Sequence, residues 1–120
     1  MSKDDSRFGA TVRRLREEKK IGLRKFAQMV GMSPTYLSKV ERDEFNPPSE
    51  EKIRAIAKAL GQDADELLAL AGRVSAELAD IIKRHPREMA TFLRAANGLS
   101  AEEMQRLAED ARRLKKDEGT

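Results

Sequence analysis

The stretch Leu23–Arg42 (LRKFAQMVGMSPTYLSKVER) constrains the fold of this chain of 120 residues more than any other. Gly31 lies where the chain must turn, and glycine adopts the left-handed backbone of a helix end at the least cost. Ser33 and Pro34 then favour a new helix, with the serine as N-cap and the proline at the first helical position. The stretch therefore predicts two short helices that meet at a tight corner.

The second of these helices is expected to present a polar outer face. Apolar residues at helical spacing would pack both helices onto a common core: Phe26, Val30, Met32, Leu37 and Val40. Between them, hydroxyl groups, an aromatic ring and two cations point outward: Thr35, Tyr36, Ser38, Lys39 and Arg42. A helix that exposes such groups can contact base edges in the DNA major groove. The pattern indicates a helix-turn-helix.

The composition favours an all-α protein and excludes several other classes. The chain has no cysteine, so it can form neither a disulfide framework nor a thiolate metal site. It contains no apolar run of membrane-spanning length and no signal peptide, so we expect a soluble, cytoplasmic protein without membrane partners. With one histidine and no phosphate-binding glycine loop, we expect no enzyme activity, no cofactor and no metal. Abundant Ala, Leu, Glu, Lys and Arg favour helix.

Positive charge is concentrated at the N-terminal end of the chain. Residues 1–42 carry eleven Lys and Arg against five Asp and Glu, whereas residues 43–72 carry three against seven. Residues 73–120 are nearly balanced, with ten basic and nine acidic residues. The positive charge is therefore concentrated in the part of the chain that contains the second predicted helix, which would read the DNA bases. A DNA-binding surface requires such a concentration of positive charge.

Residues from about Phe8 to Gly72 resemble the lambda-repressor/Cro-like (XRE-type) helix-turn-helix transcriptional regulators. The resemblance is carried by Phe26-Ala27, Gly31-Met32-Ser33-Pro34, Tyr36-Leu37-Ser38-Lys39-Val40-Glu41-Arg42, Asn46-Pro47 and Ile56-Ala57-Lys58-Ala59-Leu60-Gly61. It implies a five-helix domain. The residues place this domain at 6–72, with Ser6 as the expected N-cap of its first helix and Gly72 at its end. The resemblance also implies a sequence-specific regulator, a repressor that binds a palindromic operator in double-stranded DNA as a homodimer.

The DNA contacts are expected on two helices and one loop. The residues expected to read bases are Ser33, Pro34, Thr35, Tyr36, Ser38 and Lys39. Those expected to hold phosphates are Leu23, through the backbone N–H groups at its helix start, together with Arg24, Lys25, Arg42 and Asn46. The alternative is that these are ordinary solvated residues of a helical hairpin.

The resemblance also implies an ion pair between Arg16 and Glu41 that orients the helix-turn-helix. Asp43 and Glu44 stand where the family usually has glycine followed by a basic residue. These two acids should weaken general DNA affinity or be turned away from it. Phe45 is expected to cover the next helix, and a partner contact is the alternative.

Residues 73–116 are predicted to form three short helices that serve dimerisation or partner binding. Ser75, Pro86 and the Ser100–Glu103 capping box would start them. The apolar residues expected at the dimer interface are Met89, Phe92, Leu93, Met104, Leu107, Ala111 and Leu114. The alternative is that these faces fold back onto the first domain of their own chain.

A different function class remains open for this C-terminal part. The chain could be an antitoxin or immunity-type regulator whose C-terminal helices bind a toxin or are cleaved by a regulatory peptidase. The enzyme interpretation has little support, because His85 precedes a proline and suits a helix cap or the surface. Ser49-Glu50-Glu51-Lys52 matches an S-x-x-K signature without its companion motifs, and it is better explained as a helix start.

Overall fold

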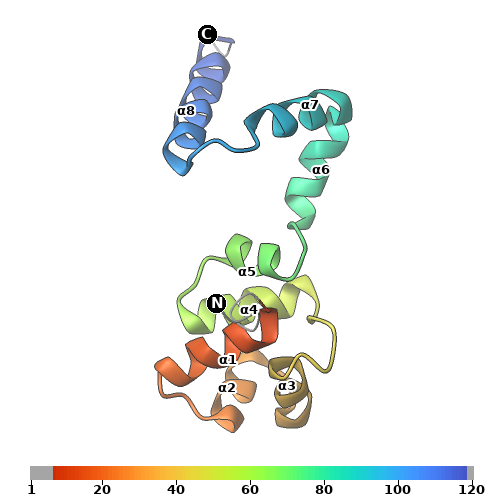
Figure 1. The fold of residues 1–120 in the computed structure, drawn as a ribbon, viewed down its shortest axis with the longest axis vertical. Helices are drawn as coiled ribbons and strands as arrows, with labels where there is room; N and C mark the ends of the chain where they lie inside the picture. The colour runs from red at the N-terminus through yellow and green to blue at the C-terminus, as the bar shows by residue number, and fades with distance from the viewer. Residues whose placement is uncertain (1–6, 119–120) are drawn as a thin grey trace. The chain divides into compact units, whose positions relative to one another are not determined.

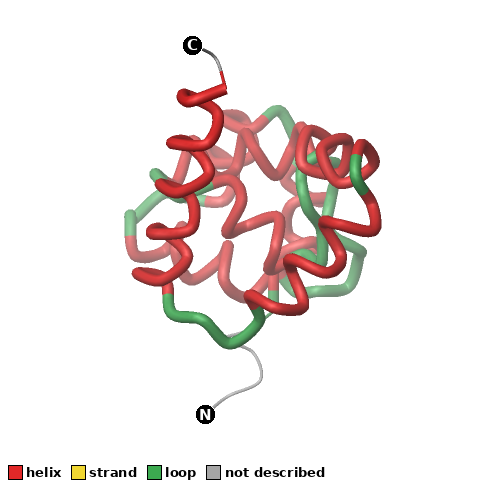
Figure 2. The backbone as a smooth tube through the Cα atoms, turned by 90° about the horizontal axis from the view of Figure 1, so that it is seen from above, coloured by secondary structure: helices red, strands yellow, loops and turns green. Residues whose placement is uncertain are grey.

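The computed structural model describes residues 7–118, and this part of the chain consists of α-helices joined by short loops (Figures 1 and 2). The helices are α1 (Phe8–Glu18), α2 (Leu23–Val30), α3 (Pro34–Glu41), α4 (Glu50–Leu60), α5 (Ala64–Leu70), α6 (Ala76–Arg84), α7 (Pro86–Ala96) and α8 (Ala101–Glu118). The all-α prediction is confirmed. The chain divides into two compact units between Ala79 and Asp80.

The first unit has one apolar core, to which α1–α5 all contribute. α4 packs against α2 and α5, and α1 packs against α3 (Figure 1). The buried side chains are Phe8, Val12, Phe26, Ala27, Val30, Leu37, Val40, Ile53, Ile56, Ala57, Leu60, Leu67 and Leu68. The apolar residues expected to pack the helical hairpin are all among them except Met32, which is partly buried. The opposite face of α3 is thereby left to solvent.

The corner between α2 and α3 forms as the sequence predicts. Gly31 ends α2 with a left-handed φ of 70°. The backbone N–H of Met32 then donates to the carbonyl oxygen of Ala27 at 2.9 Å, which closes the helix end. At the start of α3, the Ser33 hydroxyl oxygen accepts a hydrogen bond from the Tyr36 backbone N–H at 3.1 Å. Pro34 occupies the first turn, where it costs no backbone hydrogen bond.

The start of α1 is held by a residue far away in the sequence. Ser6, its expected N-cap, lies outside the described residues, and the N-cap Arg7 makes no capping hydrogen bond through its side chain. Instead, the Asp43 carboxylate accepts hydrogen bonds from the backbone N–H groups of Gly9 at 2.9 Å and Ala10 at 3.2 Å. A Cβ at Gly9 would lie only 2.1 Å from the carbonyl oxygen of Val40, so only glycine allows this close approach. Asp43 therefore joins the start of α1 to the end of α3.

Replacing Asp43 with alanine should destabilise the chain by about 2 kcal/mol. The variant loses the cap on α1, and its alanine must adopt a left-handed backbone, since φ is 59° at this position. Urea denaturation followed by circular dichroism measures the change. Glu44→Ala is the control, because Glu44 is exposed and its loss should change the unfolding free energy by less than about 0.5 kcal/mol. Equal effects of the two substitutions would contradict the capping role of Asp43.

Contacts of the first unit continue past α5 into the start of α6. Arg73 donates to the backbone carbonyl oxygens of Pro47 and Pro48. The Glu50 carboxylate accepts a hydrogen bond from the Ala76 backbone N–H at 3.0 Å. This bond and a second one from Arg54 hold the pKa of Glu50 below its ordinary value. These contacts attach Arg73 and Ala76, which follow Gly72, to the first unit. The domain limits 6–72 and 73–116 therefore remain a proposal.

The second unit contains the rest of α6, together with α7 and α8. His85 and Pro86 stand at the N-cap and the first turn of α7. The predicted capping box opens α8, because Ser100 and Glu103 exchange hydrogen bonds of 2.9 and 3.1 Å between side chain and backbone. Among the described residues of this unit, Ala96 is the buried apolar one, and several large apolar side chains remain exposed.

Candidate nucleic-acid interface

A buried ion pair holds α3, the helix that is predicted to read bases, against α1. Arg16 donates from Nε to Oε2 of Glu41 at 2.7 Å and from Nη2 to Oε1 at 2.9 Å. Its Nη1 donates to the carbonyl oxygen of Ile21 at 2.8 Å. The two side chains are only 10% and 3% exposed, and the hydrogen bonds that Arg16 donates to Glu41 raise the pKa of Arg16. The pair that the resemblance implies is thus present, and it fixes how α3 is oriented on the domain.

One flank of α3 faces the start of α2 across a shallow hollow. Its volume is about 260 Å³, and its lining contains six of the eleven residues expected to contact DNA: Leu23, Arg24, Pro34, Thr35, Ser38 and Arg42. Thr35, Ser38 and Arg42 follow each other at helical spacing on α3, so they lie along one side of it. The helical hairpin therefore brings predicted base-reading and predicted phosphate-binding residues to one surface.

The start of α2 offers backbone groups at the same surface. Gly22 is its N-cap and provides no side-chain acceptor. The first-turn backbone N–H groups, which belong to Leu23, Arg24 and Lys25, have no acceptor within the helix. These groups and the positive end of the helix dipole favour an anion. Together with the exposed side chains of Arg24 and Lys25, they can hold a phosphate.

The other flank of α3 carries an aromatic cluster that we define as Tyr36, Lys39 and Phe45. The rings of Tyr36 and Phe45 have centroids 5.7 Å apart and are inclined at 42°. The Lys39 ammonium lies 5.2 Å from the centroid of the Phe45 ring. The expectation that Phe45 covers α4 is wrong, since the ring packs on α3 and remains 45% exposed. The left-handed turn at Asp43 explains the difference, because it redirects the loop along α3.

The two acids after α3 have different surroundings. The Asp43 carboxylate is bound to the start of α1, and Asp43 does not line the hollow shared by α2 and α3. Glu44 stays beside Arg42, with Nε of Arg42 3.2 Å from Oε2 of Glu44 in an exposed pair. Such a pair contributes little to stability, but it competes with a phosphate for the guanidinium. Ser33, the N-cap of α3, and Asn46, in the loop after α3, are both exposed.

A cluster of arginines on α1 was missed by the sequence analysis. A hollow of about 360 Å³ at the end of α3 is lined by Arg7, Ala10, Arg13, Arg14, Glu17, Glu41, Arg42 and Asp43. Arg13 and Arg14 pair with acids one turn later on α1, at 3.3 and 3.0 Å. Residues 7, 10, 14 and 17 recur at helical spacing, so the pattern alone could have placed them on one face. It could not show that this face adjoins Arg42.

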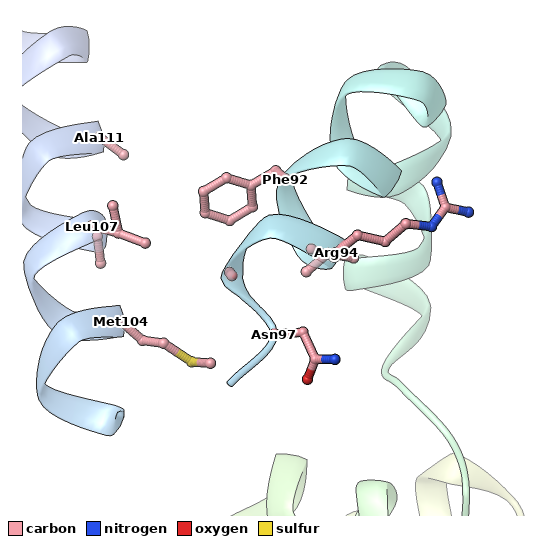
Figure 3. A pocket seen from close by; sticks show the side chains of 9 residues that line it. Phe92, Arg94, Asn97, Met104, Leu107 and Ala111 are labelled. Atoms are coloured by element: carbon pink, nitrogen blue, oxygen red, sulfur yellow. The ribbon is translucent and has the colours of Figure 1, made fainter. Parts of the chain in front are cut away.

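An apolar groove separates α7 from α8 in the second unit (Figure 3). Its volume is about 640 Å³, and its lining consists of Phe92, Leu93, Arg94, Ala96, Asn97, Met104, Leu107, Ala108 and Ala111. In Figure 3, Phe92 points toward α8, from which Leu107 and Ala111 point back. Five of the seven residues expected at the dimer interface thus line one groove, whereas Met89 and Leu114 do not. Phe92, Leu93 and Leu114 are 48%, 50% and 66% exposed.

Neither a metal-binding cluster nor a membrane-spanning helix is found in the part of the chain that the structure describes. No three His, Cys, Asp or Glu side chains within residues 7–118 are grouped to hold a metal ion. Within the same range, no helix combines the length and the apolar character needed to cross a lipid bilayer.

The core, the tight corner and the polar face of α3 together define a helix-turn-helix protein. Residues 7–70 match the family model described as a helix-turn-helix domain. This match spans more than half of the chain. The chain belongs to this family, and the resemblance to helix-turn-helix regulators is confirmed.

Among solved structures, the chain is similar to the clp gene regulator ClgR from Corynebacterium glutamicum. One ClgR structure is 32% identical, with a TM-score of 0.47, and the match covers 57% of this chain and 87% of that one. A second is 26% identical, with a TM-score of 0.49 and coverages of 78% and 93%. A SinR/SinI protein complex matches at 20% identity and a TM-score of 0.49, over 91% and 98% of the two chains. No curated protein matches the chain.

Proposed function

We propose that this protein is a sequence-specific transcriptional regulator that represses by occupying a palindromic operator as a homodimer. The observation that best supports DNA binding is the hollow shared by α2 and α3, whose lining joins Arg24 and Arg42 to Thr35 and Ser38. Cations beside an exposed helix can contact the phosphates that flank a DNA groove, while the helix itself contacts the bases. The repressor role follows the resemblance to lambda-repressor/Cro-like proteins.

In this proposal, α3 lies in the major groove with its first turn against the bases. Thr35 contacts bases on one flank, where its methyl group can pack on thymine, and Lys39 and Tyr36 donate hydrogen bonds on the other. The hydroxyl hydrogen of Ser33 remains able to donate, because its oxygen is the atom that caps α3. The start of α2 and Arg42 hold phosphates on the two sides. The arginines of α1 extend the positive surface beyond Arg42.

A dimer would extend the length of DNA that can be read. α3 has eight residues and is therefore about 12 Å long, enough to reach only a few base pairs. Two copies related by a two-fold axis would read both halves of a palindrome, with half-site centres about one helical turn of DNA apart or a multiple of that. The exposed apolar groove of the second unit supports this part of the proposal, because apolar side chains gathered on one surface favour association.

Alanine substitutions should separate base contacts from phosphate contacts. Lys39→Ala and Thr35→Ala should each cost about 1–3 kcal/mol at the preferred site and much less on random DNA. Arg24→Ala should weaken binding to all sequences alike and reduce the slope of affinity against salt by about one. The preferred site is first selected from a random DNA library, and fluorescence anisotropy then measures the affinities at several salt concentrations.

Gln28→Ala is the control, because Gln28 is exposed on α2 and lines none of the hollows described beside α3. It should change neither the affinity nor the salt slope. If Lys39→Ala and Thr35→Ala left the ratio of specific to random affinity unchanged, α3 would not be the reading helix. If the library yielded no preferred sequence, sequence-specific regulation itself would be wrong.

A further inference from the structure

Phe45 makes contacts that its position in a surface loop does not require. It is not part of the apolar core of the first unit, and 45% of its surface remains exposed. Its ring nevertheless contacts two side chains of α3 that the proposed function assigns to base reading. Tyr36 lies against it at a centroid distance of 5.7 Å, and the ammonium of Lys39 lies 5.2 Å from its centroid. The Phe45 ring thus lies against both a ring and a cation that the proposed function assigns to base reading.

The ring restricts Lys39 in a way that matters for recognition. A lysine side chain has more rotamer freedom than most, and ordering it on binding lowers affinity. An ammonium over an aromatic face is attracted by the negative charge of the ring face. This attraction favours the few rotamers that bring the ammonium along α3 toward Phe45. Lys39 therefore samples fewer rotamers before it binds DNA than a lysine without an aromatic neighbour.

The loop itself keeps the Phe45 ring in place. Tyr36 packs on the ring at an inclination of 42°, an arrangement that aromatic pairs favour. Asp43 turns the chain with its left-handed backbone and is anchored by its hydrogen bonds to Gly9 and Ala10. Pro47 and Pro48 stiffen the loop two residues later, where their carbonyl oxygens accept hydrogen bonds from Arg73. The ring is therefore supported from both ends of its loop.

We propose that Phe45 is a positioning residue for DNA recognition, which holds the Lys39 ammonium where it meets a base edge and so contributes to sequence specificity. The inference rests on the proposed function, in which α3 reads the operator. Phe45 acts through Lys39, while Tyr36 keeps the ring from turning away. A lysine held in this way donates to a base acceptor at lower entropic cost than a free one, and a mismatched base loses that advantage.

The test compares Phe45→Leu with Phe45→Trp in the full chain. Leucine keeps an apolar side chain but has no aromatic face, whereas tryptophan offers the strongest face for a cation. Phe45→Leu should lower the ratio of specific to random affinity about five- to tenfold, with unchanged random affinity and salt slope. Phe45→Trp should keep the ratio within about twofold of the original chain. Urea midpoints of both variants should stay close to the original value, because the residue is half exposed.

A double-mutant cycle with Lys39→Ala tests whether Phe45 acts through that lysine. In the Lys39→Ala background, Phe45→Leu should lower the ratio by less than about twofold, since the cation that it positions is gone. Proton NMR of the free protein gives a second measurement. The ring current of Phe45 should shift the terminal methylene protons of Lys39 upfield, and the shift should disappear in Phe45→Leu and persist in Phe45→Trp.

Three outcomes would contradict the role proposed for Phe45. An unchanged ratio in Phe45→Leu, or an equal loss with and without Lys39, would overturn it, the latter because Phe45 would then act on DNA directly. A loss in Phe45→Trp as large as in Phe45→Leu would overturn it as well. If the original chain has a preferred sequence, these failures leave the proposed function intact. A chain with no preferred sequence would overturn both.

Discussion

Glu41→Ala is expected to lower the free energy of unfolding by about 3–5 kcal/mol. The substitution leaves the Arg16 guanidinium in a site where it is only 10% exposed, without the carboxylate that accepts two of its hydrogen bonds. An unpaired buried charge is much more costly than the pair, because water cannot replace the lost partner. Domains of this size have total stabilities of about 5–15 kcal/mol, so the loss would be a large fraction.

Urea denaturation of the full chain, followed by circular dichroism, measures this loss. Glu17→Ala is the matched control, because Glu17 pairs with Arg13 at the surface and should contribute less than about 1 kcal/mol. The double variant Arg16→Met/Glu41→Met should be more stable than Glu41→Ala, since it leaves no buried charge. A loss below about 0.5 kcal/mol for Glu41→Ala would mean that water reaches Arg16 and that the pair does not fix α3.

The double variant Phe92→Glu/Leu107→Glu is expected to be a monomer and to bind operator DNA at least about 10²-fold more weakly. Both residues line the groove between α7 and α8, and Phe92 points toward Leu107 across it (Figure 3). Two carboxylates there would have to be desolvated on association, which apolar contacts cannot compensate. The affinity falls because one reading helix alone loses the advantage of two linked half-site contacts.

Light scattering measures the mass in solution, and fluorescence anisotropy measures the affinity for the operator. The control is Ala95→Glu/Gln105→Glu, which adds the same charges to α7 and α8 at exposed positions outside the groove. This control should remain a dimer with the original affinity. A dimer that persisted in Phe92→Glu/Leu107→Glu would place the interface elsewhere, and a monomeric original chain would contradict the proposed homodimer.

The two variants act on different requirements of the same proposed function. The Arg16–Glu41 pair determines whether a single copy presents α3 in the right orientation. In the proposed function, the groove of the second unit would bring two copies of α3 to the DNA together. Operator affinity should therefore fall in both variants, but only Glu41→Ala should lower the unfolding free energy of the first unit, since Phe92 and Leu107 belong to the second.

The positions of the helices could be predicted from the sequence, because the residues that end a helix act on their own neighbours. Gly31 adopts a left-handed backbone by itself, and Ser33 caps a backbone N–H three residues later. The Ser100–Glu103 capping box likewise spans a single turn. The spacing of apolar residues then identified the buried faces, and the family resemblance suggested the Arg16–Glu41 pair.

Only the tertiary structure decided what the loop after α3 does. Asp43 accepts a hydrogen bond from Gly9, 34 residues earlier, at the start of α1, and Phe45 packs back on α3 instead of on α4. The arginines of α1 adjoin Arg42 only because Gly9 lets α1 approach the end of α3 closely. None of these contacts follows from local preferences, since each depends on the direction in which a loop leaves a helix. That direction is determined by the packing of the whole domain, which a pattern of neighbouring residues does not contain.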